Sequence, residues 1–173
     1  MKREKQGRAW VFGDDINTDY IISSRRKRDT LDPVALAKYM MEDIRPGFGL
    51  QVNPGDFLVG GRNFGCGSAM EIATAVIIGA GVRAVIAKSF ARSFFRNGIN
   101  GGLLLIETDT GSIRDGDMLL PDTGGDSIVI RNVTRGEEYY GTGMSRFLSS
   151  IVESGGLIPY LSENRGFGSW AKQ

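Results

Sequence analysis

Residues 57–71 read FLVGGRNFGCGSAME and contain the strongest structural signal in the chain. Three apolar residues lead into a segment rich in glycine, and Ser68 precedes the apolar residues 70–80. This pattern predicts a strand, a tight loop and a helix, with Ser68 as N-cap and Gly81 directly after the helix. Glycine lets a backbone approach a ligand closely, and a helix start offers amide donors to an anion. The same residues also suit a purely structural turn, because their spacing is that of neither a dinucleotide-binding loop nor a P-loop.

Apolar runs on both sides of this stretch predict the other elements of an α/β domain. Strands are expected at residues 9–12, 20–22, 57–59, 84–87 and 103–106, and helices at 33–41, 70–80, 90–97 and 144–153. After residue 109, turns rich in Asp and Gly bracket short apolar runs, which predict small antiparallel strands. We therefore expect a central mixed sheet flanked by helices over residues 1–161, followed by a polar tail, 162–173, in which Phe167 and Trp170 are able to dock.

Composition excludes several classes of function. The chain has 173 residues with 21 Lys and Arg against 20 Asp and Glu, so its net charge of +1 gives no broad field for nucleic acid or a membrane surface. It contains no apolar run long enough to span a bilayer, and no apolar segment follows its charged start, so a cytoplasmic location is expected. Cys66 is the only cysteine and histidine is absent. An intramolecular disulfide, a Ser-His-Asp triad, and a zinc or iron–sulfur site built by this chain alone are thereby excluded.

Several motifs, in their order along the chain, resemble the mobile "swivel" domain of the aconitase superfamily, especially the small subunits of 3-isopropylmalate dehydratase and homoaconitase. The motifs are GDDINTD at residues 13–19, Asp32-Pro33, NFGCGSAMEI at 63–72, VIAKSFAR at 85–92 and FRNGIN at 95–100. The likeness extends over residues 7–160. It implies a swivelling β/β/α domain.

The resemblance also implies a chemistry. The related enzymes are hydro-lyases that move a hydroxyl between neighbouring carbons of a hydroxydicarboxylic acid, such as isopropylmalate in leucine biosynthesis. A large subunit carries a [4Fe–4S] cluster, and the small subunit binds no metal and closes over the substrate. Ser68 matches the serine alkoxide that removes the proton, and Asp19 matches an aspartate that supports the site. The residues expected to line the substrate are Gly65, Cys66, Gly67, Ala69 and Met70. Judged without the resemblance, Asp19 suits turn chemistry with Asp14 and Asp15, and Cys66 suits a packed loop residue.

The chain departs from the family at Met70, where the family has an arginine that would hold a substrate carboxylate. Losing such a charge-assisted contact costs about 1.5–3 kcal/mol, which weakens binding about tenfold or more unless another cation replaces it. Either the basic run at 25–28 supplies that cation, or the substrate carries an apolar group near Met70, as a dimethylmalate or another substituted malate would. A further alternative is a non-catalytic binding or regulatory subunit.

The basic run, residues 25–28, reads RRKR. By itself it suits a solvated loop and is too short to indicate a nucleic-acid site. In the resemblance it occupies the substrate-selecting loop, which is apolar in isopropylmalate-type enzymes and contributes an arginine in homoaconitate-type enzymes. We therefore expect Arg26 or Arg28 to contact a substrate carboxylate, a geometry that guanidinium suits.

Overall fold

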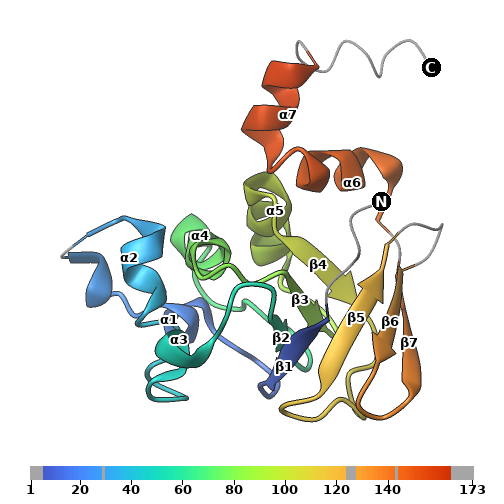
Figure 1. Cartoon of the computed structure of the whole chain (residues 1–173). Coiled ribbons are helices and arrows are strands. Elements are labelled where there is room, and N and C mark those ends of the chain that lie inside the picture. Colours follow the sequence, from blue (N-terminus) through green and yellow to red (C-terminus); the bar gives the residue numbers. More distant parts are fainter. Residues whose placement is uncertain (1–5, 29, 124–127, 143, 165–173) are drawn as a thin grey trace.

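The computed structural model describes residues 6–28, 30–123, 128–142 and 144–164. Its strands are β1 (Gly7–Val11), β2 (Phe57–Val59), β3 (Ala84–Ala87), β4 (Leu104–Glu107), β5 (Met118–Asp122), β6 (Ile128–Asn132) and β7 (Glu137–Gly141). Its helices are α1 (Thr18–Ile21), α2 (Pro33–Ala37), α3 (Phe48–Gln51), α4 (Glu71–Gly79), α5 (Arg92–Gly101), α6 (Arg146–Glu153) and α7 (Leu157–Glu163), with a 3-10 turn, η1 (Arg26–Arg28). Figure 1 shows their arrangement.

The strands form one seven-stranded mixed sheet in the order β4-β3-β2-β1-β5-β6-β7. Strands β1 to β4 are parallel, whereas β5, β6 and β7 are antiparallel. The amide of Thr142, just after β7, donates to the carbonyl of Glu107 in β4 at 2.9 Å, so the two outer strands meet at one end. The sheet is therefore nearly a closed barrel. The predicted mixed sheet with small antiparallel strands in the C-terminal half is confirmed.

Both faces of the parallel strands are buried, which explains their continuous apolar runs. Leu58 and Val85 pack in a core shared with helices α1 to α5, and their neighbours Val59 and Ile86 pack inside the curled sheet. Because β1 to β4 follow one another across the sheet, right-handed connections place their helices on the same face. Figure 1 shows these helices together on that face and α6 and α7 beyond α5.

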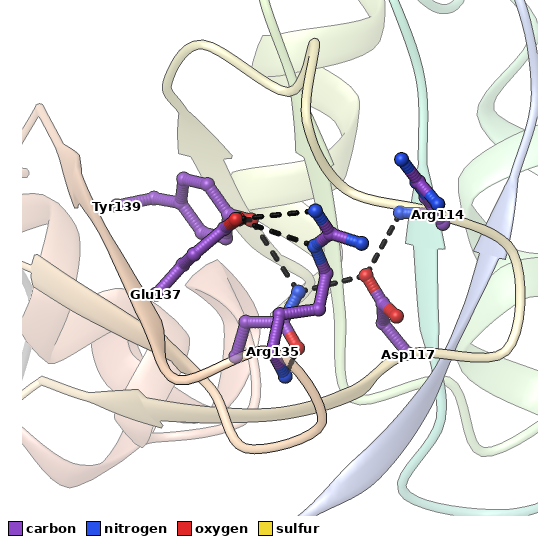
Figure 2. A network of polar contacts seen from close by, with 6 residues as sticks. Arg114, Asp117, Arg135, Glu137 and Tyr139 are labelled. Atoms are coloured by element: carbon purple, nitrogen blue, oxygen red, sulfur yellow. Dashed lines mark hydrogen bonds and ion pairs between the residues drawn. The ribbon is translucent and has the colours of Figure 1, made fainter.

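A polar network ties the antiparallel half together at the end of the sheet where β5 and β7 begin and β6 ends (Figure 2). The buried side chain of Asp117 accepts from the amide nitrogen of Asn132 at 2.7 Å and from the backbone of Arg114 at 2.9 Å. Beside it, Glu137 accepts from the Tyr139 hydroxyl at 2.6 Å and from Arg135 at 3.2 Å. These contacts lower the pKa of Glu137, with the hydrogen bond from Tyr139 contributing most. Because these donors and acceptors satisfy one another, the network is structural.

The strand predicted at residues 20–22 is wrong, because these residues belong to helix α1 and the turn after it. The side chain of Asn17 accepts a 2.9 Å hydrogen bond from the amide of Asp19, and this N-cap starts the helix. Ile21 and Ile22 are nevertheless fully buried. Apolar character therefore predicted their burial, but not their conformation.

The helix predicted at 33–41 begins as expected, with Asp32 accepting from the amide of Val34, but ends at Ala37. Met41 has a φ of 58°, which is incompatible with a continuing helix. Ile44, which follows this turn, is 39% exposed. Residues 48–51 form the short helix α3, which buries Phe48.

At the C-terminus, the predicted last helix is α6, which starts at Arg146 behind an N-cap at Ser145. A further helix that the sequence reading missed, α7, follows and crosses the expected domain boundary at residue 162. Tyr160 of α7 packs against Ile151 of α6 and Ile99 of α5. Phe167 and Trp170 lie outside the described residues.

Candidate functional site

The candidate site lies where the parallel strands end at their carboxyl side. The loops that follow β1, β2 and β3 meet there, at residues 12–19, 60–70 and 88–91. In open α/β sheets this edge is where ligands bind, because loops from neighbouring strands converge on it. The fold therefore brings Asp19 and Ser68, which are far apart in the sequence, to one edge of the molecule.

The loops after β1 and β2 are joined by main-chain hydrogen bonds. The amide of Gly65 donates to the carbonyl of Ile16, and the amide of Thr18 donates to the carbonyl of Cys66, both at 2.8 Å. Asn17 and Cys66 form a parallel bridge between them. The two loops thus continue the β1–β2 pairing beyond the sheet, and this short ladder fixes the backbone on which the site is built.

Two aspartates that follow β1 hold the loop after β2 in place. This loop, residues 60–70, is called the glycine loop below. Asp14 accepts from the backbone amide of Arg62 at 2.7 Å, and Asp15 accepts from the side-chain amide of Asn63 at the same distance. The amide of Asp15 in turn donates to the carbonyl of Arg62 at 2.8 Å. These two aspartates therefore hold the loop, as the turn reading of their sequence suggested.

Two glycines in the loop are required by their conformation and surroundings. Gly65 has a φ of +80°, and a Cβ built there would overlap the ring of Phe94. Gly67 has a φ of +90°, and its Cβ would lie 2.5 Å from the side chain of Asn17. Phe94 stacks on Phe90 at a centroid distance of 6.2 Å, and both rings pack against the core beneath the loop. The loop thus packs closely against the stacked rings of Phe90 and Phe94.

Ser68 is exposed on this loop, but it is not the N-cap of α4. The cap is Met70, whose amide donates to the carbonyl of Ser68 at 2.7 Å and so delays the helix by two residues. The same carbonyl accepts from the Thr18 hydroxyl at 2.9 Å. The helix predicted at 90–97 likewise starts later, because α5 begins behind Ala91, and the Ser89 hydroxyl accepts from the amide of Asn63. The Ser68 peptide is therefore held firmly.

Cys66 lies half-buried between these contacts. Burial raises the pKa of its thiol, and the nearby carboxylate of Asp15 raises it further. The thiol is thus neutral near pH 7, unlike the thiolate that binds metals. Among the residues that the structure describes, no group of three or more His, Cys, Asp or Glu side chains is arranged to hold a metal ion.

Asp19 stands at the start of α1, one residue after Thr18. Its carboxylate accepts a 2.9 Å hydrogen bond from the Ser24 hydroxyl. Ser24 directly precedes the basic run, so Asp19 links the β1 loop to that segment. The structure therefore joins three features that the sequence singled out separately: the aspartate, the glycine loop and the basic run.

The last three residues of the basic run form η1, and the four cations of the run have different surroundings. Arg26 donates through two nitrogens to Glu42, each at 2.8 Å, and its guanidinium lies 3.9 Å from the centre of the Tyr39 ring. The hydrogen bond from Arg26 lowers the pKa of Glu42. Arg25 pairs with Asp43 at 2.8 Å. The side of the Arg26 guanidinium that was expected to bind a substrate carboxylate thus binds Glu42, and this ion pair anchors the turn.

The sequence did not indicate that Lys27 lies beside the glycine loop. Its ammonium nitrogen lies 2.7 Å from the sulfur of Met70, whereas Arg28 is exposed. Residues 25–28 are all cationic and follow no periodicity, so no signal in the sequence identified which of them turns toward the glycine loop. Ala69 is exposed beside Ser68, and Met70 is half-buried against the helix-side core.

Two pockets open near this edge. One, of about 520 Å³, is lined by residues of the β1 loop together with Tyr20 and Arg45. The other, of about 500 Å³, is lined by Phe90, Arg92, Phe95, Arg96 and Glu107. Ser68 lines neither of these pockets and is exposed. Such a position suits a site that is completed by the surface of another protein chain.

The comparisons with known proteins agree with this geometry. Residues 47–111 match the family described as Aconitase C-terminal domain. The 3-isopropylmalate dehydratase small subunit 1 of Archaeoglobus fulgidus is 48% identical over 160 residues, covering 92% of this chain and 98% of that protein. The 3-isopropylmalate dehydratase small subunit of Methanosarcina mazei is 49% identical over 158 residues, covering 90% and 94%.

The fold agrees as well. The crystal structure of a 3-isopropylmalate dehydratase from Methanocaldococcus jannaschii matches with a TM-score of 0.87 and 40% identity, covering 96% of this chain and 98% of that one. None of the described helices has the length and apolar character needed to cross a membrane. The resemblance found in the motifs is thus confirmed over almost the whole sequence, and the chain belongs to the family of 3-isopropylmalate dehydratase small subunits.

Proposed function

We propose that this chain is the small subunit of an iron–sulfur hydro-lyase that dehydrates and rehydrates a hydroxydicarboxylic acid such as 3-isopropylmalate. The observation that carries the proposal is the ladder between the β1 and β2 loops, which brings the Asp19 and Ser68 segments together in a chain nearly half identical to named small subunits. The exposed position of Ser68 suits a substrate that a large subunit holds and this chain covers.

Ser68 is proposed as the base that removes the proton beside a substrate carboxylate. A serine hydroxyl is a very weak acid, so its alkoxide requires nearby positive charge or hydrogen-bond donors. Helix α4 begins three residues later, at Glu71, and contributes the positive end of its dipole. Asp19 is proposed to orient the groups around this serine, since its carboxylate is itself held by Ser24. The exposed segment Gly67–Ala69 lies against the substrate in this arrangement.

The cofactor is assigned to the large subunit. One cysteine and no histidine do not provide the ligands of a [4Fe–4S] cluster, and the neutral Cys66 thiol is a packing residue. No step assigned to this chain passes through the cluster. A reducing cytoplasm would protect such a cluster and suits a chain with a single thiol.

The test is to assemble the chain anaerobically with a large subunit and follow formation of the alkene from 3-isopropylmalate, homoisocitrate and 2,3-dimethylmalate. Ser68→Ala should lower kcat by about 100- to 10,000-fold, the range typical of a lost general base. Ser162→Ala, on the exposed face of α7, is the matched control and should retain full activity. Near-normal turnover by Ser68→Ala would refute the base assignment. An assembled complex inactive on every acid would instead favour a binding or regulatory subunit.

A further inference from the structure

The ammonium group of Lys27, in the basic run, turns toward the glycine loop. Its nitrogen lies 2.7 Å from the sulfur of Met70. The two preceding arginines are both paired with carboxylates, Arg25 with Asp43 and Arg26 with Glu42. Within the described ranges, no carboxylate lies at ion-pair distance from Lys27.

A thioether is a poor partner for an ammonium ion. Sulfur of this kind carries no charge and is only a weak hydrogen-bond acceptor, whereas an ammonium has three strong donors. Lys27 is also half-buried, so it has lost part of its hydration. A cation kept in such surroundings retains a strong tendency to bind an anion. The contact with Met70 therefore places the charge without neutralising it.

The position of Lys27 is built into the fold. Its turn is anchored on one side by the bidentate contact of Arg26 with Glu42, and on the other by the Ser24 hydroxyl bound to Asp19. Met70 is fixed in turn by its own amide, which donates to the carbonyl of Ser68 at 2.7 Å. Lys27 thus contacts Met70, which lies two residues after the proposed base Ser68, and both side chains belong to segments held by these contacts.

We propose that Lys27 binds one carboxylate of the substrate from the turn after α1, and that Met70 offers its apolar side chain to the alkyl substituent of the same molecule. This inference rests on the proposed function and specifies its substrate as an alkyl-substituted hydroxydicarboxylate. A lysine is a compact point charge and imposes less geometry on a carboxylate than an arginine fork. The site therefore accepts a carboxylate in more than one orientation.

The first experiment compares Lys27→Met with the control Lys38→Met in the complex with the large subunit. Lys38 is an exposed lysine that follows α2, so its replacement removes the same charge away from the loop. Lys27→Met should raise KM by about 10- to 100-fold with a much smaller change in kcat, as expected for a lost charge-assisted contact. Lys38→Met should match wild type. An unchanged KM in Lys27→Met would overturn the proposal.

Rescue distinguishes a substrate contact from a merely structural one. Adding Met70→Arg to Lys27→Met returns a cation to the same place from the opposite loop, and should recover most of the lost KM. Adding Met70→Leu should not. If neither double variant differs from Lys27→Met, the cation is not the missing element and the proposal fails.

A binding measurement on the full chain separates this inference from the proposed function. Succinate, used as a dicarboxylate probe, should shift the backbone amide NMR signals of residues 66–70 in a saturable manner in wild type and Lys38→Met. Lys27→Met should lose that shift. A saturable shift that persists in Lys27→Met, or none in wild type, would overturn the role of Lys27. A complex that binds succinate through Lys27 but turns over no acid would refute the proposed function alone.

Discussion

The side-chain hydroxyl of Thr18 donates a 2.9 Å hydrogen bond to the carbonyl oxygen of Ser68. Thr18 is 1% exposed, so water does not readily replace this bond. Thr18→Val keeps the shape of the side chain and removes only the donor. We expect a loss of about 1 kcal/mol in the free energy of unfolding, together with a clear fall in kcat, because the Ser68 peptide loses one of its two constraints. Urea unfolding and steady-state kinetics of the assembled complex measure the two effects.

Thr108→Val is the matched control for this change. The Thr108 hydroxyl also donates to a backbone carbonyl, that of Tyr140 at 3.0 Å, but it joins β4 and β7. We expect a comparable or smaller loss of stability and no loss of turnover. Equal kinetic effects in both variants would show that the Thr18 bond has no special bearing on the site.

Gly65→Ala tests the close packing of the glycine loop. Gly65 and Gly155 have nearly the same φ, +80° and +83°, but only Gly65 faces a ring, whereas a Cβ at Gly155 meets nothing within 4 Å. Gly155→Ala should therefore cost only the backbone strain, about 1 kcal/mol. Gly65→Ala should cost about 3 kcal/mol or more, because the loop must move away from Phe94. Equal losses of unfolding free energy in chemical denaturation would contradict this account of the loop.

Acid should weaken the contact between Asp115 and Arg45. Hydrogen bonding from Arg45 is the largest cause that lowers the Asp115 pKa from 3.8 to about 2, with the Val11 amide and Arg8 contributing. Because the folded pKa lies below the unfolded one, the stabilisation is complete above about pH 5 and is lost as the pH falls through about 2. Asp115→Asn should cost about 1 kcal/mol at pH 7, a figure reduced for solvent screening.

The measurement is the difference in unfolding free energy between wild type and Asp115→Asn from pH 7 down to pH 2. That difference should shrink as the pH falls below 4. Glu153→Gln, which changes an exposed carboxylate at the end of α6, serves as control and should show a much smaller difference throughout. A constant gap between wild type and Asp115→Asn would rule out the pH dependence.

Cys66 should react slowly with alkylating agents at neutral pH. Burial, and to a smaller extent Asp15, raises the pKa of its thiol, so little reactive thiolate is present. Mass spectrometry after iodoacetamide treatment should show a rate below that of free cysteine, rising steeply with pH. Asp15→Asn should increase the rate only modestly, because burial is the larger cause. Rapid alkylation at pH 7 would contradict the neutral thiol.

Secondary structure was predicted correctly from the sequence where a strand is apolar on both faces, and the prediction was wrong where an element is very short. Strands β2 and β3 were found because runs such as Ala84–Ala87 are buried on both faces. Helix α1 was missed because four residues carry no measurable periodicity, and its start depends on one side-chain contact from Asn17. Helix α7 was missed because Gly155 and Gly156 indicated an end, whereas they connect two helices.

The candidate site was found by motif and refined by geometry. Ser68 and Asp19 were identified from their surrounding sequence, and the structure explains how the loops bring those segments together. The role expected for Arg26 or Arg28 came from the resemblance of their segment to the family's substrate-selecting loop, whereas Glu42, the partner of Arg26, lies sixteen positions away in the sequence. Lys27 was overlooked because the direction of a side chain in a single 3-10 turn depends on tertiary contacts that composition does not encode.

The main-chain ladder between the loops after β1 and β2 also has a consequence for how this protein was able to diverge. Gly65 and Gly67 are required within this ladder and its loop, but the main-chain hydrogen bonds at residues 16–18 and 65–66 involve neither position 27 nor position 70. Positions 27 and 70 face each other across that fixed frame. A cation can therefore move by substitution from one of these positions to the other without removing any hydrogen bond of that frame.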